Sequence, residues 1–338
     1  MGNTSSAALP DDLPSEDELA TFSGPLKQGW LARIEAEKTL VKRFAGRSKF
    51  EDAAEMFESA AIKFKLAKEN DEAAKCYARV AECGQKDGDE MKAASSFVLA
   101  AETMVLGKNV DAALTYYRSA ISIYSNQGKF DRAAKYSQAL ADLLAGEAEF
   151  DPTRLQAALD AYVGACDLFE MTSNGTVSLR KCREKHAMLC ASSPDDEKLL
   201  ATAASAFTSI GSECMEKNIT KFHAKSFFQK AVLCGLARGD MIAAGEDHQS
   251  GCNADPQYPG SREGRLCQSL MQAIKDDDFD SFTKALSDYN EITPLDSWHM
   301  TLLLKAKRRY FGNPGAENED DLVGGGATGA GGEEDDLI

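Results

Sequence analysis

The sequence lacks long apolar runs and an excess of positive charge. No run of apolar residues approaches the 18 or more that a membrane-spanning helix needs. Residues 1–25 are polar, with prolines and acidic side chains, so no secretory signal peptide is predicted. The 38 Lys and Arg residues stand against 54 Asp and Glu residues, which gives a net charge of −16. Because nucleic-acid binding needs a basic surface, general binding to DNA or RNA is not expected.

Motifs for catalysis are missing as well. The chain has four histidines, and it contains no phosphate-binding loop, dinucleotide fingerprint, serine-hydrolase elbow or zinc-protease motif. Its nine cysteines include no Cys-x-x-Cys, which favours reduced thiols packed at helix interfaces. We therefore predict a protein that is not an enzyme and needs no cofactor.

Two clusters deserve a test as metal sites, and neither fits. Cys182, His186 and Cys190 share one stripe of a predicted helix, but a straight stripe cannot surround a tetrahedral zinc ion. The acidic run 276–280 lacks the glycine and the distal glutamate of a calcium loop. It is better explained as a solvent-exposed turn that begins a helix. No metal is predicted.

What the sequence does contain is an internal repeat. A pair of alanines is followed by an aromatic residue about one helical turn later, as in Ala53, Ala54 and Phe57. The first six pairs begin 20, 20, 19, 21 and 24 residues apart, which fits one helix and a short turn per step. Two steps make a hairpin of about 40 residues, close to the period of tetratricopeptide arrays. The pairs begin at Ala53, Ala73, Ala93, Ala112, Ala133, Ala157 and Ala203.

Polar turn signals separate the repeated helices. Residues 68–71, 86–89, 107–109 and 126–129 contain glycine, asparagine or aspartate, which suit helix ends and helix starts. Alternating β-branched residues are scarce, so no sheet is predicted. The pattern predicts an all-α fold: a tetratricopeptide-like (TPR-like) right-handed solenoid of antiparallel helical hairpins with a C-terminal helical bundle.

The composition changes along the chain and predicts four regions. The last region contains glycine, alanine and acidic residues and cannot bury enough apolar surface to fold alone. Before it, a long break is predicted at 251–262, followed by three helices within 263–310. The regions are a flexible N-terminal extension (1–25), the hairpin array (26–215), the C-terminal bundle (216–311) and a disordered acidic tail (312–338).

Several motifs resemble those of one known family. Residues 221–231, with the sequence KFHAKSFFQKA, and residues 295–307, with LDSWHMTLLLKAK, are similar to helices of the soluble NSF attachment proteins. Residues 128–135 and 180–182 also fit, and the resemblance runs from about residue 28 to the end of the chain. The helix around Trp298 and the acidic, leucine-containing end favour the alpha/beta type over the gamma type.

This resemblance implies a function as well as a fold. Members of the family lie along the acidic four-helix SNARE bundle and recruit the hexameric ATPase NSF, which unwinds the SNAREs. Basic side chains clustered on an acidic protein would orient it on such a bundle and speed the encounter. One or two of the carried-over lysines are expected to be ordinary solvated residues. By position, the implied SNARE-binding residues are Lys129, Lys135, Lys181, Lys185, Ile219, Phe222 and Arg262.

The end of the chain also fits the family pattern, in which acidic residues precede a penultimate leucine that stimulates the ATPase. Asp335, Asp336 and Leu337 occupy these positions. Leu322 follows a second acidic pair, and a linker rich in glycine and alanine separates the two copies. We favour Leu337, because a flexible linker of about ten residues can span the difference.

The sequence differs from the family pattern in the segments that would contact a membrane. Its members carry an exposed loop rich in phenylalanine and glycine after the first helix, whereas this chain offers only Phe44 with Gly46. Gly2 with Ser6 fits the N-myristoylation pattern, and one acyl chain needs a second membrane signal. An unmodified, disordered N-terminus is the alternative. We expect a cytoplasmic protein peripherally associated with the cytosolic face of membranes.

The favoured function is that of an adaptor between SNARE complexes and NSF in vesicle-mediated, ER–Golgi-type protein transport. A generic TPR-type scaffold that grips a short peptide is the alternative. An enzyme would need convergent polar groups, which the sequence does not show.

Overall fold

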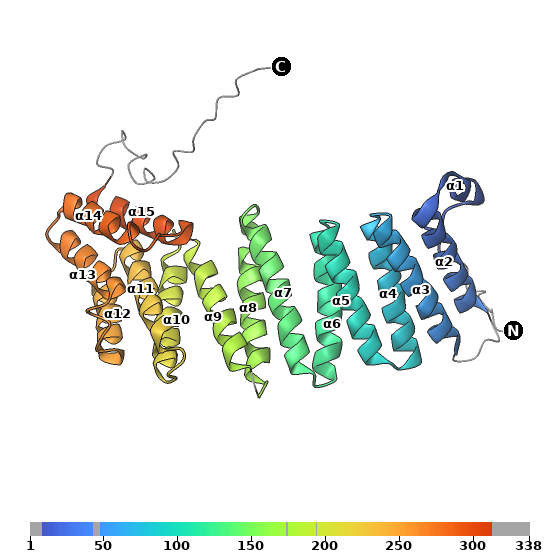
Figure 1. The fold of residues 1–338 in the computed structure, drawn as a ribbon, viewed down its shortest axis with the longest axis horizontal. Helices are drawn as coiled ribbons and strands as arrows, with labels where there is room; N and C mark the ends of the chain where they lie inside the picture. Colours follow the sequence, from blue (N-terminus) through green and yellow to red (C-terminus); the bar gives the residue numbers. More distant parts are fainter. Residues whose placement is uncertain (1–8, 43–47, 174, 194, 313–338) are drawn as a thin grey trace, which may run out of the picture. The chain divides into compact units, whose positions relative to one another are not determined.

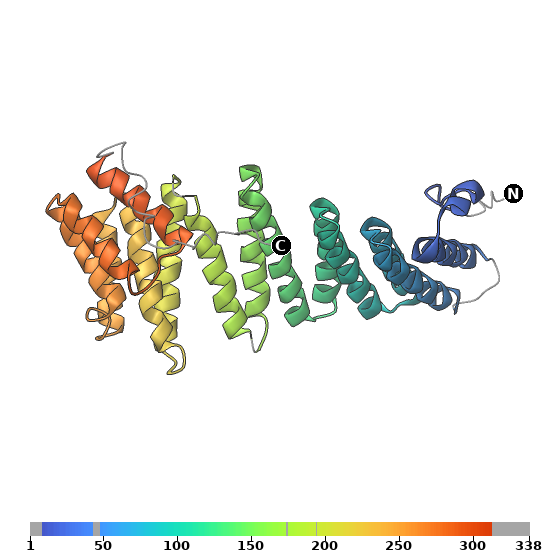
Figure 2. The same ribbon diagram turned by 45° about the horizontal axis from the view of Figure 1, so that its top comes forward.

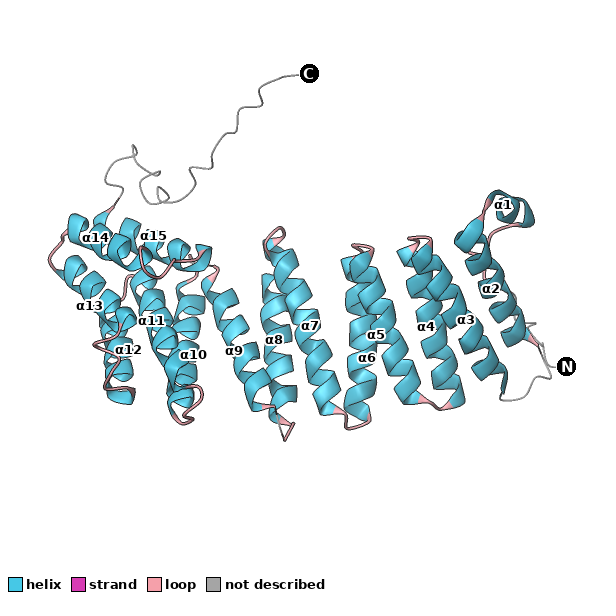
Figure 3. Cartoon of the chain, in the orientation of Figure 1, coloured by secondary structure: helices cyan, strands magenta, loops and turns pink. Residues whose placement is uncertain are grey.

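The computed structural model describes residues 9–42, 48–173, 175–193 and 195–312 (Figure 1). Within these residues it contains fifteen α-helices, one short 3₁₀-helix and no strand (Figure 3). The prediction of an all-α fold of helical hairpins is confirmed for this part of the chain. By its contacts the chain divides into two compact units, residues 1–190 and 191–338.

The first unit is a row of antiparallel helices in which each helix from α2 to α7 packs against the next one in the sequence. The turns lie where the sequence predicts them, because glycine, asparagine and aspartate end one helix and begin another. The elements are α1 (Glu16–Thr21), α2 (Gly24–Val41), α3 (Ser48–Leu66), α4 (Asn70–Asp87), α5 (Glu90–Leu106), α6 (Val110–Asn126), α7 (Phe130–Ala148), η1 (Pro152–Arg154), α8 (Leu155–Glu170) and α9 (Thr176–Ala191).

The alanine pairs form the contacts between neighbouring helices. Ala53, Ala73, Ala93 and Ala133 are fully buried, and so is the ring of Phe57. Alanine favours a helix and adds little bulk, so two backbones approach closely at each pair. The aromatic ring one turn later fills the remaining space. The repeat in the sequence is therefore a repeat of helix–helix contacts.

Four successive turns contain a residue in the left-handed region. Gly88 and Gly128 have φ angles of 86° and 66°, as expected for glycine after a helix. Lys68 and Lys108 have φ angles of 64° and 60° in the alternate turns, where a side chain costs stability. Figure 1 shows the lysine turns, after α3 and α5, at one edge of the row and the glycine turns at the other.

Residues 9–22, here termed the N-terminal strap, contain helix α1. Helix α1 begins with a capping box: the Glu18 N–H donates to Ser15 Oγ at 3.3 Å, and the Ser15 N–H donates to Glu18 Oε2 at 2.8 Å. The ring of Phe22 stacks on that of Trp30 in α2. Within the predicted extension over 1–25, the structure therefore places the capped helix α1 and the first residues of α2.

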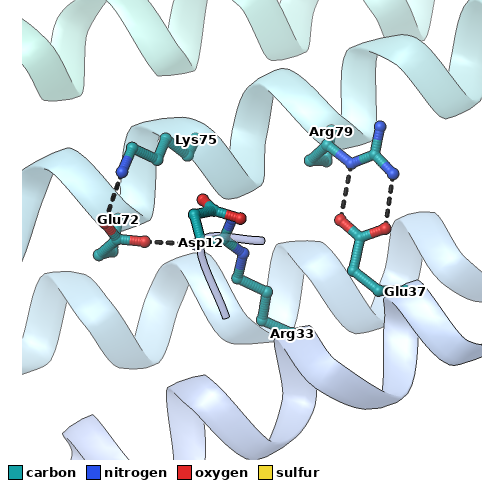
Figure 4. A network of polar contacts seen from close by, with 6 residues as sticks. All are labelled: Asp12, Arg33, Glu37, Glu72, Lys75 and Arg79. Atoms are coloured by element: carbon teal, nitrogen blue, oxygen red, sulfur yellow. Dashed lines mark hydrogen bonds and ion pairs between the residues drawn. The ribbon is translucent and has the colours of Figure 1, made fainter. Parts of the chain in front are cut away.

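Buried ion pairs fix the strap and α2 to α4 (Figure 4). Arg33 is 3% exposed; its Nη2 lies 2.5 Å from Asp12 Oδ2 in the strap, and its Nη1 pairs with Glu72. Arg79 donates two hydrogen bonds, of 2.8 and 2.6 Å, to the carboxylate of Glu37, which is 2% exposed. These pairs matter for stability because a buried charge that loses a partner keeps its desolvation cost without the compensating attraction.

The second unit is built around one helix, α11. It contacts α10, α12, α13 and α15, and every residue from Phe227 to Ala237 is buried. A helix that is apolar on nearly all sides is expected to be covered on nearly all sides. The helices are α10 (Glu197–Met215), α11 (Lys221–Arg238), α12 (Met241–Ala254), α13 (Arg262–Lys275), α14 (Phe279–Asn290) and α15 (Ser297–Phe311).

The break predicted at 251–262 is shorter in the structure, because α12 continues to Ala254. A Cβ atom on Gly251 would lie 2.8 Å from the ring of Tyr258 and 3.0 Å from that of Phe228. This glycine therefore allows close packing inside a helix and does not form a turn. The three helices predicted within 263–310 are confirmed as α13, α14 and α15.

Helix α15 lies across the ends of α10 and α11 (Figure 2). Lys305 Nζ lies 3.0 Å from Asp195 Oδ1, and Arg309 Nη2 lies 2.5 Å from Glu197 Oε1. The Lys230 ammonium of α11 lies 5.4–5.9 Å from the centroids of three rings, which belong to Phe207, Phe227 and Trp298. Ion pairs and cation–π contacts thus hold the last helix in place.

The boundaries of the compact units differ from the predicted regions. The sequence places the change of architecture at 215/216, whereas the division by contacts falls after Cys190. Helix α10 belongs to the second unit because its main neighbour is α11. Of the predicted tail, 312–338, the structure describes only Gly312. None of the helices in the described residues is long and apolar enough to cross a bilayer.

Candidate partner-binding surface

The seven residues proposed to contact SNAREs divide between the two units. Lys129, Lys135, Lys181 and Lys185 belong to the first unit, on or next to α7 and α9. Ile219, Phe222 and Arg262 belong to the second unit, at the ends of helices.

Helix α7 presents a row of exposed cations. Lys129 is the N-cap residue, and Lys135 lies six residues further along; both are exposed. Between them, Arg132 is exposed at the intermediate turn, so that the three cations follow an i, i+3, i+6 spacing on one side of the helix. Sequence reasoning missed Arg132, although this spacing is visible in the sequence.

Aromatic rings hold two of these cations in place. The Lys135 ammonium lies 5.2 Å from the centroid of Tyr136, and the Arg132 guanidinium lies 5.7 Å from that of Tyr124. The two tyrosine rings stack 5.8 Å apart. Burial raises the pKa of both phenols, so the rings stay neutral at physiological pH. Cations restrained on aromatic faces lose less side-chain entropy when a partner binds.

Helix α9 contributes two exposed lysines, one of which is paired with a carboxylate of α7. Lys181 is exposed. Lys185 is exposed too, but its Nζ lies 2.6 Å from Asp142 Oδ2 of α7. The Tyr162 hydroxyl donates to the other oxygen of Asp142 at 2.6 Å, and burial together with this hydrogen bond raises the pKa of Tyr162. Lys185 must therefore weaken or break its ion pair with Asp142 before it can contact an acidic partner.

The turn between α10 and α11 exposes apolar side chains. Ile219 is 90% exposed and Phe222 is 71% exposed. The Thr220 hydroxyl donates to the Cys214 carbonyl oxygen at 2.9 Å and closes the turn, which leaves both side chains in solvent. The Lys221 ammonium lies 5.4 Å from the ring of Phe222. Adjacent exposed apolar side chains beside a cation are typical of a docking surface.

Arg262 stands at the first position of α13 and is exposed. Its Nη1 donates to Thr293 Oγ1 at 3.3 Å, after the end of α14. It also lines a cleft of about 300 Å³, together with Tyr289 and the exposed Ile292. Among the described residues, Thr293 is the acceptor found for this guanidinium, and the 3.3 Å bond is weak enough for a carboxylate to replace it.

The structure also places the residues weighed as metal ligands. Cys182 is fully buried, and its Sγ lies 3.6 Å from the Tyr162 carbonyl oxygen, whereas Cys190 Sγ lies 3.8 Å from His186 Nε2. The described residues contain no group of three or more His, Cys, Asp or Glu side chains arranged to hold a metal ion. In the acidic run, Asp278 accepts a hydrogen bond from the Ser281 N–H at 2.9 Å, which confirms a turn that begins a helix.

The remaining candidate residues lie outside the described residues. They are Gly2, Phe44, Leu322, Asp335, Asp336 and Leu337.

Comparison with known proteins connects this surface to a family. The model of the family described as "Soluble NSF attachment protein, SNAP" matches residues 32–310. The chain belongs to this family. The alpha-soluble NSF attachment protein of Vitis vinifera is 29% identical over 295 residues, which are 86% of this chain and 97% of the relative. That of Mus musculus is 30% identical over 281 residues, or 82% and 89%. A probable vesicular-fusion protein sec17 homolog of Schizosaccharomyces pombe is 30% identical over 280 residues, or 83% and 92%.

Membership of the soluble NSF attachment protein family confirms the resemblance drawn from the helix motifs. The matched span includes all seven candidate residues of the two units. It ends before the acidic, leucine-containing terminus and begins after Gly2.

Proposed function

We propose that this protein is an adaptor that binds assembled SNARE complexes and recruits and stimulates the ATPase NSF, which disassembles them in vesicle fusion and intracellular transport. The observation that carries the proposal is the row Lys129, Arg132 and Lys135 on a chain of net charge −16 within this family. An acidic protein with three exposed cations in one row has a directional surface for an acidic rod such as a SNARE bundle.

The second unit supplies a contact of another kind. Ile219 and Phe222 would bury apolar area against the partner, while Lys221 beside them meets its acidic rim. Apolar anchors surrounded by charge give affinity at the centre and orientation at the edge of an interface. Neither anchor supports the fold, because both are largely exposed.

Recruitment of NSF is assigned to the C-terminus, with Asp335, Asp336 and Leu337 as the stimulating residues. Peripheral attachment to the cytosolic face of membranes is assigned to Gly2, through an acyl group, and to Phe44. Intact-mass measurement on protein from its native cell tests the acyl group, and an unmodified Gly2 would reject it.

A SNARE-disassembly assay with NSF and ATP tests the function. The triple charge reversal Lys129→Glu, Arg132→Glu and Lys135→Glu should lower SNARE affinity by tenfold or more, since each lost charge contact costs on the order of 1 kcal/mol. Three other exposed lysines provide a matched control with the same total charge change: Lys65→Glu, Lys198→Glu and Lys284→Glu. An equal loss of SNARE affinity in both triple variants would show that only the net charge matters and would reject the row on α7 as the binding surface.

Removal of residues 333–338 should abolish stimulation of NSF and leave SNARE binding intact, which a TPR-type peptide scaffold does not predict. Leu337→Ala and Leu322→Ala, made separately, decide which leucine acts. Wild-type protein that gives no disassembly above background would overturn the proposed function.

A further inference from the structure

The loop between α14 and α15 carries a threonine that directly precedes a proline. Thr293 is partly exposed, and the residues on either side of it, Ile292 and Pro294, are exposed. The residue before a proline avoids the helical conformation, and this segment lies outside both helices. Exposed loops are the parts of a fold that other proteins reach most easily. Proline-directed protein kinases modify a serine or threonine in this position.

A guanidinium already lies against the hydroxyl group of this threonine. Arg262 Nη1, at the first position of α13, donates to Thr293 Oγ1 at 3.3 Å. The guanidinium is a planar fork of N–H donors that matches the oxygens of a phosphate group. A phosphate on Thr293 would be bonded to the same oxygen that Arg262 contacts now. Its other oxygens would therefore come within reach of the fork.

A second cation lines the same cleft. Arg265 follows Arg262 by about one helical turn, is exposed, and lines the cleft of about 300 Å³ together with Ile292. Its Nε donates to the Ser261 carbonyl oxygen at 3.3 Å, which ties the side chain to the first turn of α13. Both arginines thus bring positive charge to the side of the cleft that the threonine contacts.

Carboxylates flank the threonine on its own side of the cleft. Asp288 lines the cleft, and Glu291 is exposed two residues before Thr293. Asp296 is exposed three residues after it. These groups would repel a phosphate and raise its pKa, whereas Arg262 would lower that pKa. The ionisation of the phosphate would therefore report directly on its contact with the arginine.

The chain has one other serine or threonine before a proline, and its surroundings differ. Ser193 precedes Pro194, and residues 195–197 are Asp, Asp and Glu. A phosphate there would meet like charge, and two of these carboxylates are already paired with cations of α15. Of the two positions, Thr293 is the one at which the structure shows an arginine bonded to the hydroxyl group.

We propose that Thr293 is phosphorylated by a proline-directed protein kinase and that Arg262 binds the resulting phosphate. The kinase transfers the γ-phosphoryl group of ATP. The Thr293 oxygen attacks the γ-phosphorus, an O–P bond forms, and the bond to the bridging oxygen of ADP breaks. The hydroxyl proton passes to the catalytic base of the kinase. The new negative charge and the guanidinium then form charge-assisted hydrogen bonds.

The phosphate would act on the candidate partner-binding surface, although this consequence rests on the proposed function. An arginine that binds a phosphate of its own chain is less available to an acidic partner, and the phosphate adds negative charge beside it. SNARE affinity is therefore expected to fall about fivefold on phosphorylation, the change that the loss of one charge contact produces. Phosphorylation itself does not depend on any SNARE.

Phosphorylation is tested on the full chain with a purified mitogen-activated protein kinase and ATP. Peptide mapping by mass spectrometry should place a phosphate on Thr293. Pro294→Ala should lower its incorporation tenfold or more, whereas Thr293→Ser keeps an acceptor before the proline and should retain it. Ser193→Ala is the matched control and should be phosphorylated at Thr293 as the wild type is. A wild-type protein without phosphate on Thr293 would overturn the site.

Binding of the phosphate by Arg262 is tested by titration of the phosphorylated protein with phosphorus NMR. The second pKa of a phosphothreonine is about 6, and a bound guanidinium lowers it. Arg262→Gln should raise this pKa by about half a unit, as expected for a solvent-exposed ion pair. Arg118→Gln removes an exposed arginine from α6 and should leave the pKa unchanged. Equal values in the wild type and in Arg262→Gln would overturn the assigned contact.

A SNARE-binding measurement separates this proposal from the proposed function. Unmodified protein that fails to bind SNAREs would reject the proposed function, while the phosphate on Thr293 and its contact with Arg262 would stand. If unmodified protein binds SNAREs and phosphorylated protein binds them as tightly, the expected effect of the phosphate on the surface would be wrong.

Discussion

The two units bury their helices in different ways. In the first unit each helix contacts its neighbours in the sequence, and the alanine pairs repeat the same contact from α3 to α7. In the second unit one helix, α11, is surrounded by four others. A row of helices gains its stability as a sum of neighbouring interfaces, whereas a helix enclosed by four others makes one cooperative body.

This difference also decides where each unit can meet a partner. A helix in a row keeps one face in solvent, so the first unit can offer Lys129, Arg132 and Lys135 along the side of α7. The enclosed helix has no free side, so the second unit offers Ile219 and Phe222 at the turn where α11 begins. Four changes, given in decreasing order of their predicted effect, test this difference between the units.

Phe228→Ala should have the largest effect. The ring is fully buried in α11 and lies against Gly211 and Gly251, so its removal should cost about 3–5 kcal/mol. Hydrogen exchange should rise in all helices of the second unit together. Phe57→Ala removes a ring equally buried in the first unit, and exchange there should rise mainly in α2, α3 and α4. If Phe57→Ala raised hydrogen exchange as far along the row as α8, the first unit would not be stabilised by separate interfaces between neighbouring helices.

Arg79→Met should come next, because it leaves the carboxylate of Glu37 buried without its partner. Breaking a buried pair costs about 3–5 kcal/mol, and we expect the lower end because the Arg79 side chain is 30% exposed. Urea unfolding measures the loss. Arg154→Met breaks the exposed pair with Asp111 and serves as the control, with little expected change. The double variant Glu37→Met and Arg79→Met should recover most of the stability.

Lys68→Gly and Lys108→Gly should each stabilise the first unit by about 1 kcal/mol, because glycine adopts the left-handed conformation without the cost of a side chain. The opposite change in an alternate turn, Gly128→Ala, should destabilise it by a similar amount, since a Cβ there meets open space and only the backbone conformation is unfavourable. Thermal unfolding of the three variants gives the measurement. Lysine-to-glycine variants less stable than the wild type would show that these side chains make stabilising contacts.

Acid release of the N-terminal strap should be the smallest effect. Burial by itself raises the pKa of Asp12, but the hydrogen bond and charge of Arg33 outweigh it and hold the pKa below the ordinary value of 3.8. Because the pKa of Asp12 is lower in the folded state, the pair stabilises the fold fully at pH values above the unfolded-state pKa. This stabilisation is lost as the pH falls through the folded-state pKa. Trp30 fluorescence in a Trp298→Phe background reports the strap. Asp12→Asn should show the released signal at neutral pH, and identical acid titrations of the two proteins would refute the role of Asp12.

Most of the fold could be predicted from local patterns. Each alanine pair with its aromatic residue encodes one helix face, and the glycines and aspartates between them encode turns, because these preferences act within four residues. The prediction failed where a residue served a distant contact. Gly251 resembles a turn residue in sequence but makes room for Phe228, and Asp12 in the polar segment before α2 pairs with Arg33.

Composition, spacing and motifs were enough to predict the helical repeat, the family and the lysines proposed to contact SNAREs, because these features are local or shared with relatives. The contact of Arg132 with the Tyr124 ring and the ion pair of Lys185 with Asp142 depend on the tertiary structure. Lys185 and Asp142 are 43 residues apart in the chain. Contacts over such distances depend on how one helix is placed against the next, which no short sequence pattern specifies.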